Sequence, residues 1–262
     1  MKLAIREGMI PGDSLRKKLE WLSNIGIEGV ELHGASLSLS VWELRSIFAN
    51  SPISVANISG PADLLSPDSA VRRAAMDLGK RRLYLAAELG ATGVLLVPQF
   101  GTKPLLPDLS PYRSAVELER ELFITQMREL SELAETEGTI IFLEPLNRYE
   151  AHLVNTLQDA CNLAREIGPR VRIMADFFHM NIEEADIAQS IKAAADQIVY
   201  VHVADSNRLQ PGKGHIDFNQ GFRALKEIGY DGYLGIECRI AGELESALQE
   251  CAHLLREWWQ AA

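Results

Sequence analysis

The feature that most constrains the fold is an alternation of strand and helix patterns that runs through all 262 residues. Eight segments read as strands, and most are short apolar runs, as expected for parallel strands buried on both faces. They are predicted at Leu3–Arg6, Gly29–Leu32, Ser54–Ile58, Gly93–Val97, Thr139–Leu143, Val171–Ala175, Ile198–Val201 and Tyr233–Ile236.

Helical patterns lie between these strands and carry recognisable start and stop residues. Asp13 and Ser14 can cap a first helix that ends near Gly26. Further helices are predicted at 66–90, Ser114–Gly138, Asn155–Gly168, Ile187–Asp196, Phe218–Gly229 and Glu243–Trp258. Strands alternating with helices predict βαβ units, and eight units favour a closed (β/α)₈ TIM barrel of the α/β class over an open sheet.

Length and the absence of linkers predict one domain over residues 1–262, since a one-domain barrel has about this size. No G-x-G-x-x-G motif follows the first strand, which argues against a dinucleotide-binding sheet. The net charge of −10 and the scattered basic residues argue against a nucleic-acid partner.

Cysteine usage and hydropathy set expectations about location. The three cysteines are an odd number at unrelated spacings, which favours a reducing cytoplasm over a disulfide framework. No apolar stretch approaches the roughly 18 residues of a membrane span, and no cleavable leader is recognisable. We therefore expect a cytoplasmic protein with no membrane partner.

Four predicted strands end on a residue type that binds metal ions. These residues are Glu144, Asp176, His202 and Glu237, each following a strongly apolar run. Active sites of this barrel lie at the carboxyl ends of the strands, so the four side chains should meet in one mouth. Three carboxylates placed together repel one another, and a divalent cation removes that repulsion.

The donor types favour particular metals. Three carboxylates and one imidazole suit Mn²⁺ first, with Mg²⁺, Co²⁺ or Zn²⁺ as alternatives. A lone glutamate at a strand end more often bonds a loop or an ion-pair partner. Four such residues at the ends of successive strands favour a single metal site instead.

Further polar residues follow these strand ends. Glu150 lies six residues after Glu144, His179 three after Asp176 and Arg208 six after His202. An imidazole donor, a fixed cation and a carboxylate beside a metal can hold the carbonyl and hydroxyl groups of a sugar. His33, at the end of the second strand, also faces the mouth, where it either binds a sugar hydroxyl or serves as a loop histidine.

Four strand-end motifs resemble the sugar isomerase/epimerase superfamily with the xylose-isomerase-like TIM barrel, and most closely its ketose 3-epimerase branch. The motifs are LEPLNRYE, ADFFHMN, HVADSNR and GIEC. By this resemblance Glu144, Asp176, His202 and Glu237 match metal ligands, Glu144 and Glu237 also match the acid/base pair, and Glu150, His179 and Arg208 match substrate-binding positions. Arg6-Glu7 departs from the small or aromatic residues that many relatives carry there.

The resemblance implies a metal-dependent isomerase that epimerises a ketose or keto-sugar at C3. Two glutamates would remove and return a proton through a metal-stabilised enediolate. Aldose–ketose or hydroxypyruvate-type isomerisation, and dehydration of an inosose or keto-sugar, use the same parts and stay open.

Two further alternatives have less support. An abasic-site endonuclease would need extra histidines after the early strands, where this chain has Asn57 and Gln99. A non-catalytic sugar-binding barrel would need no acid/base pair. The expected partner is a small-molecule sugar, and a homo-oligomer is left open.

Overall fold

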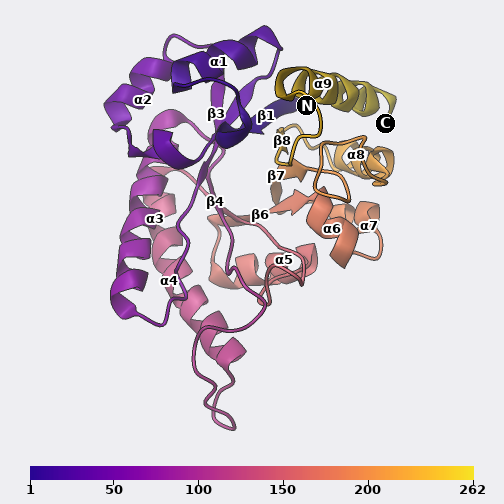
Figure 1. Ribbon diagram of the computed structural model, residues 1–262. Coiled ribbons are helices and arrows are strands. Elements are labelled where there is room, and N and C mark those ends of the chain that lie inside the picture. The colour runs from indigo at the N-terminus through magenta and orange to yellow at the C-terminus, as the bar shows by residue number, and fades with distance from the viewer.

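Eight parallel strands close into a barrel in which each strand pairs with the next in sequence and β1 pairs with β8. The computed structural model describes residues 1–262, and Figure 1 shows the helices arranged around the strands. The strands are β1 (Lys2–Arg6), β2 (Gly29–Leu32), β3 (Ser54–Ser59), β4 (Val94–Leu96), β5 (Ile141–Leu143), β6 (Val171–Asp176), β7 (Ile198–Val203) and β8 (Tyr233–Ile236). The predicted (β/α)₈ TIM barrel is confirmed.

The helices follow the strands in the order expected of βαβ units. The α-helices are α1 (Leu15–Asn24), α2 (Val41–Phe48), α3 (Ser69–Leu89), α4 (Ala115–Glu137), α5 (Leu157–Ile167), α6 (Phe177–Glu183), α7 (Ile187–Ala193), α8 (Phe218–Glu227) and α9 (Leu244–Ala261). Short 3₁₀ turns, η1 (Glu7–Met9) and η2 (Gly34–Ser38), follow β1 and β2. None of the helices combines the length and the apolarity that crossing a lipid bilayer requires.

Two of these helices were not predicted from the sequence. The helix α2 begins with a capping box, in which Ser40 Oγ accepts from the Glu43 amide and the Glu43 carboxylate accepts from the Ser40 amide. The short helix α6 begins directly after β6, and the Asp176 side chain caps it by accepting from the amides of Phe178 and His179. The helix α6 matters for the site, because Asp176 both ends β6 and caps α6.

Apolar burial is divided between two layers. Inside the barrel, seven buried residues pack together: Ala4, Ala56, Leu95, Phe142, Met174, Tyr200 and Tyr233. The rings of Phe142 and Tyr200 stack at 5.3 Å between centroids. A larger cluster of 56 buried residues fills the space between strands and helices. Because side chains fill the barrel interior, the polar site forms above it, at the carboxyl ends of the strands.

Apart from β6, which runs directly into α6, the connections at the carboxyl ends of the strands are longer than those at the opposite end. Residues 97–114, between β4 and α4, reach away from the barrel beyond the start of α4 (Figure 1). Gly101 ties the beginning of this segment to the loop after β5, since its amide donates to the Glu150 carbonyl at 2.7 Å. These loops form the rim above the strand ends.

Candidate active site

Four side chains with metal-binding atoms converge at the carboxyl ends of β5 to β8. Glu144 and Glu237 directly follow β5 and β8, Asp176 ends β6, and His202 lies near the end of β7, paired in register with Asp176. One ligand atom from each lies within 4.8 Å of every other. All four are buried, from fully buried His202 to Glu237 at 9% exposed. The predicted convergence of these residues is therefore present.

Basic side chains contact all three carboxylates in this structure. His202 Nδ1 lies 3.1 Å from Glu144 Oε1 and 3.4 Å from Glu237 Oε2. The Arg208 guanidinium donates to Asp176 Oδ2 at 2.9 Å and to Glu237 Oε2 at 2.5 Å. Arg6 also forms an ion pair with Glu237. The cluster therefore attracts positive charge, as a metal site must.

The pKa values of the buried groups follow from this arrangement. Burial alone would raise the pKa of Asp176, but Arg208, His179 and His202 outweigh it and hold that pKa well below its usual range. Burial would lower the pKa of His202, but Glu31 and Glu144 outweigh it and raise that pKa to about 10. The Asp176 carboxylate is thus held ionised, in the form that binds a metal.

The donor set fits one divalent cation. Three carboxylates and one imidazole, with ligand atoms in mutual reach, are the ligands that Mn²⁺, Mg²⁺, Co²⁺ and Zn²⁺ share. Nδ1 of His202 faces Glu144 and Glu237. Nε2 lies on the other side of the ring, 3.0 Å from Glu31. Glu31 is thus outside the candidate ligand set while contacting one of its members.

His179 lies beside this cluster with a defined hydrogen-bonding role. Its Nδ1 accepts from the Asn147 amide at 3.1 Å, so the ring proton of the neutral form is on Nε2. Nε2 lies 3.7 Å from Asp176 Oδ2, at the cluster. The Asn147 side chain also donates to Glu150 at 2.8 Å, which links two of the predicted substrate-binding residues. His179 is thus arranged to donate a hydrogen bond into the site.

Arg208 is held in place by its backbone and by an aromatic ring. Its φ of 60° lies in the left-handed region, which a residue other than glycine seldom adopts. Its guanidinium lies over the Phe178 ring, 4.5 Å from the centroid. Unusual backbone conformations of this kind concentrate at functional sites.

The opposite side of the mouth, at β1 to β3, carries a smaller polar group. His33 Nδ1 lies 3.0 Å from Ser59 Oγ and 3.3 Å from an Arg6 guanidinium nitrogen. Partial burial, together with the charge of Arg6, lowers the pKa of His33 and favours the neutral ring. His33 therefore lies across the mouth from Glu150, His179 and Arg208.

A pocket of about 360 Å³ joins the two sides. It is lined by Arg6, His33, Ser59, Gly60, Pro61, Ala62, Leu95, Val97, Phe100, Glu144, Leu146, Glu150, His179, Arg208 and Glu237. Its size falls in the range of small-molecule sites, and its mixture of apolar walls with a few convergent polar groups is typical of them. Six of the eight predicted site residues line it directly, while Asp176 and His202 lie deeper.

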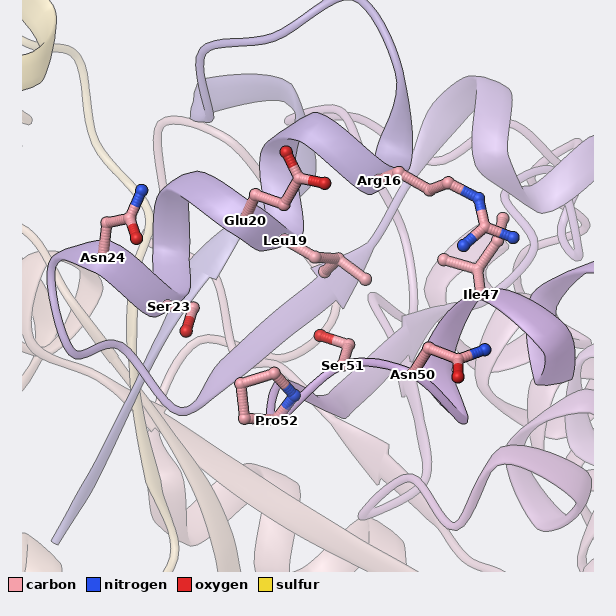
Figure 2. A pocket seen from close by; sticks show the side chains of 9 residues that line it. All are labelled: Arg16, Leu19, Glu20, Ser23, Asn24, Ile47, Asn50, Ser51 and Pro52. Atoms are coloured by element: carbon pink, nitrogen blue, oxygen red, sulfur yellow. The ribbon is translucent and has the colours of Figure 1, made fainter.

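A second groove lies far from these residues, between α1 and the segment that follows α2 (Figure 2). It has a volume of about 200 Å³ and is lined by surface side chains such as Arg16, Glu20 and Asn50. No cluster of candidate metal ligands lies there. The strand-end pocket is therefore the better candidate for chemistry.

The sequence analysis assigned no place in the site to four residues that line the pocket or contact the predicted site residues. They are Arg6, which had been noted only as a departure, and Glu31, Phe100 and Asn147. Glu31 had a signal in the sequence, since a charged residue between the apolar Val30 and Leu32 of a predicted buried strand is unusual. The roles of Phe100 and Asn147 had none, because they depend on how loops fold over the mouth.

Comparison with known proteins agrees with the TIM-barrel fold. Residues 19–258 match the family model described as xylose isomerase-like TIM barrel. The chain is 32% identical over 247 residues to 3-dehydro-D-guloside 4-epimerase of Escherichia coli K12, covering 93% of this chain and 94% of that protein. It is 32% identical over 203 residues to ketose 3-epimerase of Arthrobacter globiformis, covering 77% and 68%. The crystal structure of apo 3-keto-D-glucoside 4-epimerase from E. coli superposes with a TM-score of 0.89 at 30% identity, covering 98% of this chain and 99% of that one.

Proposed function

The chain belongs to the xylose isomerase-like TIM barrel family, and on that premise we propose that it is a divalent-metal-dependent sugar epimerase, an isomerase. One observation carries the proposal: Glu144 and Glu237 meet with Asp176 and His202 in one cluster of potential ligand atoms. Binding a sugar needs no acid/base pair, whereas inverting a carbon by proton transfer needs one group that removes the proton and another that returns a proton to the opposite face.

The names of two of these similar proteins suggest a common reaction. A ketose 3-epimerase inverts the carbon next to a C2 ketone, and a 3-keto-glycoside 4-epimerase inverts the carbon next to a C3 ketone. In both cases the hydrogen on that carbon can be removed as a proton, because the charge left behind is shared with the carbonyl oxygen. We assign this reaction to the present chain.

In the proposed mechanism, Glu144 and Glu237 act on opposite faces of the sugar. One glutamate removes the proton from the carbon beside the ketone, and the other returns a proton to the opposite face, which inverts the centre. Glu144, Asp176, His202 and Glu237 would hold the cation. When bound, a divalent cation supplies positive charge that polarises the carbonyl group.

Other residues of the pocket would position the sugar. His179 and Arg208 donate hydrogen bonds to the oxygen that gains negative charge. Glu150 and His33 bind hydroxyl groups on opposite sides of the pocket. Phe100 contributes to the apolar wall. Such a wall limits the access of water to the reacting carbon.

Two substrate classes follow from the two relatives. A ketose epimerised at C3 is the first candidate. A 3-keto-glycoside epimerised at C4 is the second, and it is favoured by one observation, the match over 94% of the 4-epimerase against 68% of the 3-epimerase. For the metal we expect Mn²⁺. The three cysteines, Cys161, Cys238 and Cys251, are all free, which supports a cytoplasmic location and one domain that needs no disulfide.

Deuterium exchange tests this proposal. The protein is loaded with Mn²⁺ in heavy water and given 2-ketopentoses, 2-ketohexoses and 3-keto-glycosides, with chelator-treated protein as the control. We expect one deuterium at the inverted carbon of the true substrate class and none with chelated protein. A product that has lost water would show a dehydratase, and deuterium at C1 or C2 would show an aldose–ketose isomerase. No exchange with any of these sugars contradicts the proposal.

A further inference from the structure

Glu31 is a buried carboxylate inside the barrel that the proposed chemistry does not use. It lies in β2 between Val30 and Leu32, and only 2% of it is exposed. A carboxylate in such a place is costly unless it is paired or hydrogen-bonded. The partners of Glu31 therefore indicate its role.

Glu31 bonds two side chains that project from β7. Its Oε1 accepts from the Tyr200 hydroxyl at 2.7 Å and lies 3.0 Å from His202 Nε2. The other nitrogen of that ring, Nδ1, lies 3.1 Å from Glu144 Oε1. Glu31 and the candidate metal ligands therefore contact opposite nitrogens of the same imidazole.

Small residues on the intervening strands leave room for this contact. In the barrel, β1 and β8 lie between β2 and β7, and Ala4 of β1 pairs in register with Gly235 of β8. A Cβ atom at Gly235 would collide with Glu31 Oε1 and would lie 2.9 Å from His202 Cδ2. The backbone at Gly235 does not have a positive φ, so any residue could adopt its conformation. A glycine is required because Glu31 occupies the place where a Cβ would lie.

We propose that Glu31 is a positioning residue that fixes the tautomer and orientation of His202 so that Nδ1 presents its lone pair to the divalent metal. The inference rests on the metal site of the proposed function. A neutral imidazole has one donor and one acceptor nitrogen, so a carboxylate that accepts from Nε2–H makes Nδ1 the acceptor. Tyr200 holds the carboxylate in place, and Gly235 leaves the space that it occupies.

The expected size of the effect follows from other metal sites. Carboxylates behind a ligand histidine orient its ring and raise its basicity, and their loss weakens metal binding by about 10–100-fold. In Glu31→Gln the side chain keeps its shape and an acceptor oxygen but loses its charge. Its effect should therefore fall at the lower end of that range.

Glu119 offers a matched control. It is fully buried and its Oε2 lies 2.6 Å from His152 Nε2, so it too is a carboxylate in contact with a histidine ring. His152 is not one of the candidate ligands. Glu119→Gln therefore removes a comparable buried charge away from the metal site.

Calorimetric titration of Mn²⁺ into the chelator-stripped full chain tests the inference, with thermal unfolding of the metal-free protein as a check on folding. We expect Glu31→Gln to raise the Kd for Mn²⁺ by about 10-fold and Glu119→Gln to leave it within about twofold. An unchanged Kd in Glu31→Gln, or an equal loss in Glu119→Gln, overturns the inference. A wild-type protein that binds no Mn²⁺ contradicts the proposed function instead.

Two further variants keep the test decisive if Glu31→Gln does not fold. Tyr200→Phe retains the ring that stacks on Phe142 but removes the hydroxyl that holds Glu31. Loss of one such hydrogen bond should raise the Kd by about 2–10-fold. Gly235→Ala should displace Glu31 and weaken Mn²⁺ binding by a similar factor. Wild-type affinity in both of these variants overturns the inference.

Discussion

The two sides of the barrel mouth differ in what they present to a ligand. The side formed by β5 to β8 carries Glu144, Glu150, Asp176, His179, His202, Arg208 and Glu237. The side formed by β1 to β4 carries Arg6, His33 and Ser59 next to the apolar Leu95, Val97 and Phe100. The difference suggests that bond making and breaking belong to the first side, and that recognition of the rest of the sugar belongs to the second.

Arg6 connects the two sides. Its guanidinium pairs with Glu237 at β8 and lies 3.3 Å from His33 Nδ1 at the end of β2. Substitutions on the two sides should nevertheless have separable effects, because both glutamates of the proposed acid/base pair, Glu144 and Glu237, lie on the β5–β8 side. The following variants test this separation, beginning with the largest expected effect.

Replacing either glutamate of the acid/base pair should nearly abolish turnover. In Glu144→Gln or Glu237→Gln the carboxamide cannot take or return a proton, and general acid–base catalysis contributes about 10²–10⁴-fold. Turnover and deuterium uptake should fall by at least that factor when each variant is assayed with Mn²⁺ bound. The control is Glu184→Gln, at a carboxylate that does not line the pocket and accepts from the Leu157 amide and the Ser190 hydroxyl; it should leave both rates near those of wild type. Full turnover in Glu144→Gln or Glu237→Gln would refute the assigned roles.

His179→Gln should cost less than the loss of a glutamate. The ring donates from Nε2 because Nδ1 accepts from the Asn147 amide, and removal of one donor to a developing oxyanion costs about 10²–10³-fold in kcat. Steady-state kinetics should show this fall with KM changed much less. A rise in KM with kcat unchanged would move His179 from catalysis to binding.

His33→Ala should affect binding much more than turnover. One hydrogen bond to a sugar hydroxyl is worth about 1 kcal/mol, or roughly fivefold in affinity. We therefore expect KM to rise about 3–10-fold while kcat stays within about twofold. A loss of kcat as large as that of the glutamate variants would break the proposed separation between the two sides.

Asn50→Ala in the groove between α1 and the segment after α2 should change neither kcat nor KM measurably (Figure 2). Asn50 is exposed and its side chain donates only to the Ser46 carbonyl within α2. The effect on the free energy of unfolding should stay within about 0.5 kcal/mol, as for most surface changes. A substantial loss of activity would show that the second groove contributes to function.

The sequence predicted one side of the mouth better than the other. Glu144, Asp176, His202 and Glu237 were found because each ends a strongly apolar strand, and strand ends of a closed parallel barrel must meet. All eight strands were located for the same reason, since buried parallel strands are continuous apolar runs. The capping box at Ser40, which marks the start of α2, was present in the sequence but was not used.

Contacts across the barrel were harder to predict. The contact between Glu31 and His202 joins residues 171 positions apart, and it depends on the tilt of strands and on the missing side chain at Gly235. The place of Phe100 in the pocket wall depends on the loop after β4. Local sequence patterns predict neither the Glu31–His202 contact nor the place of Phe100, because both arise only when the barrel closes and the loops fold over it.

The most direct test of the central claim is an anomalous-difference map from crystals of this protein grown with Mn²⁺. The account predicts one strong peak at the carboxyl ends of β5 to β8, bonded to Glu144, Asp176, His202 through Nδ1, and Glu237. A peak at any other place, or no peak while these four side chains keep their present arrangement, would contradict it.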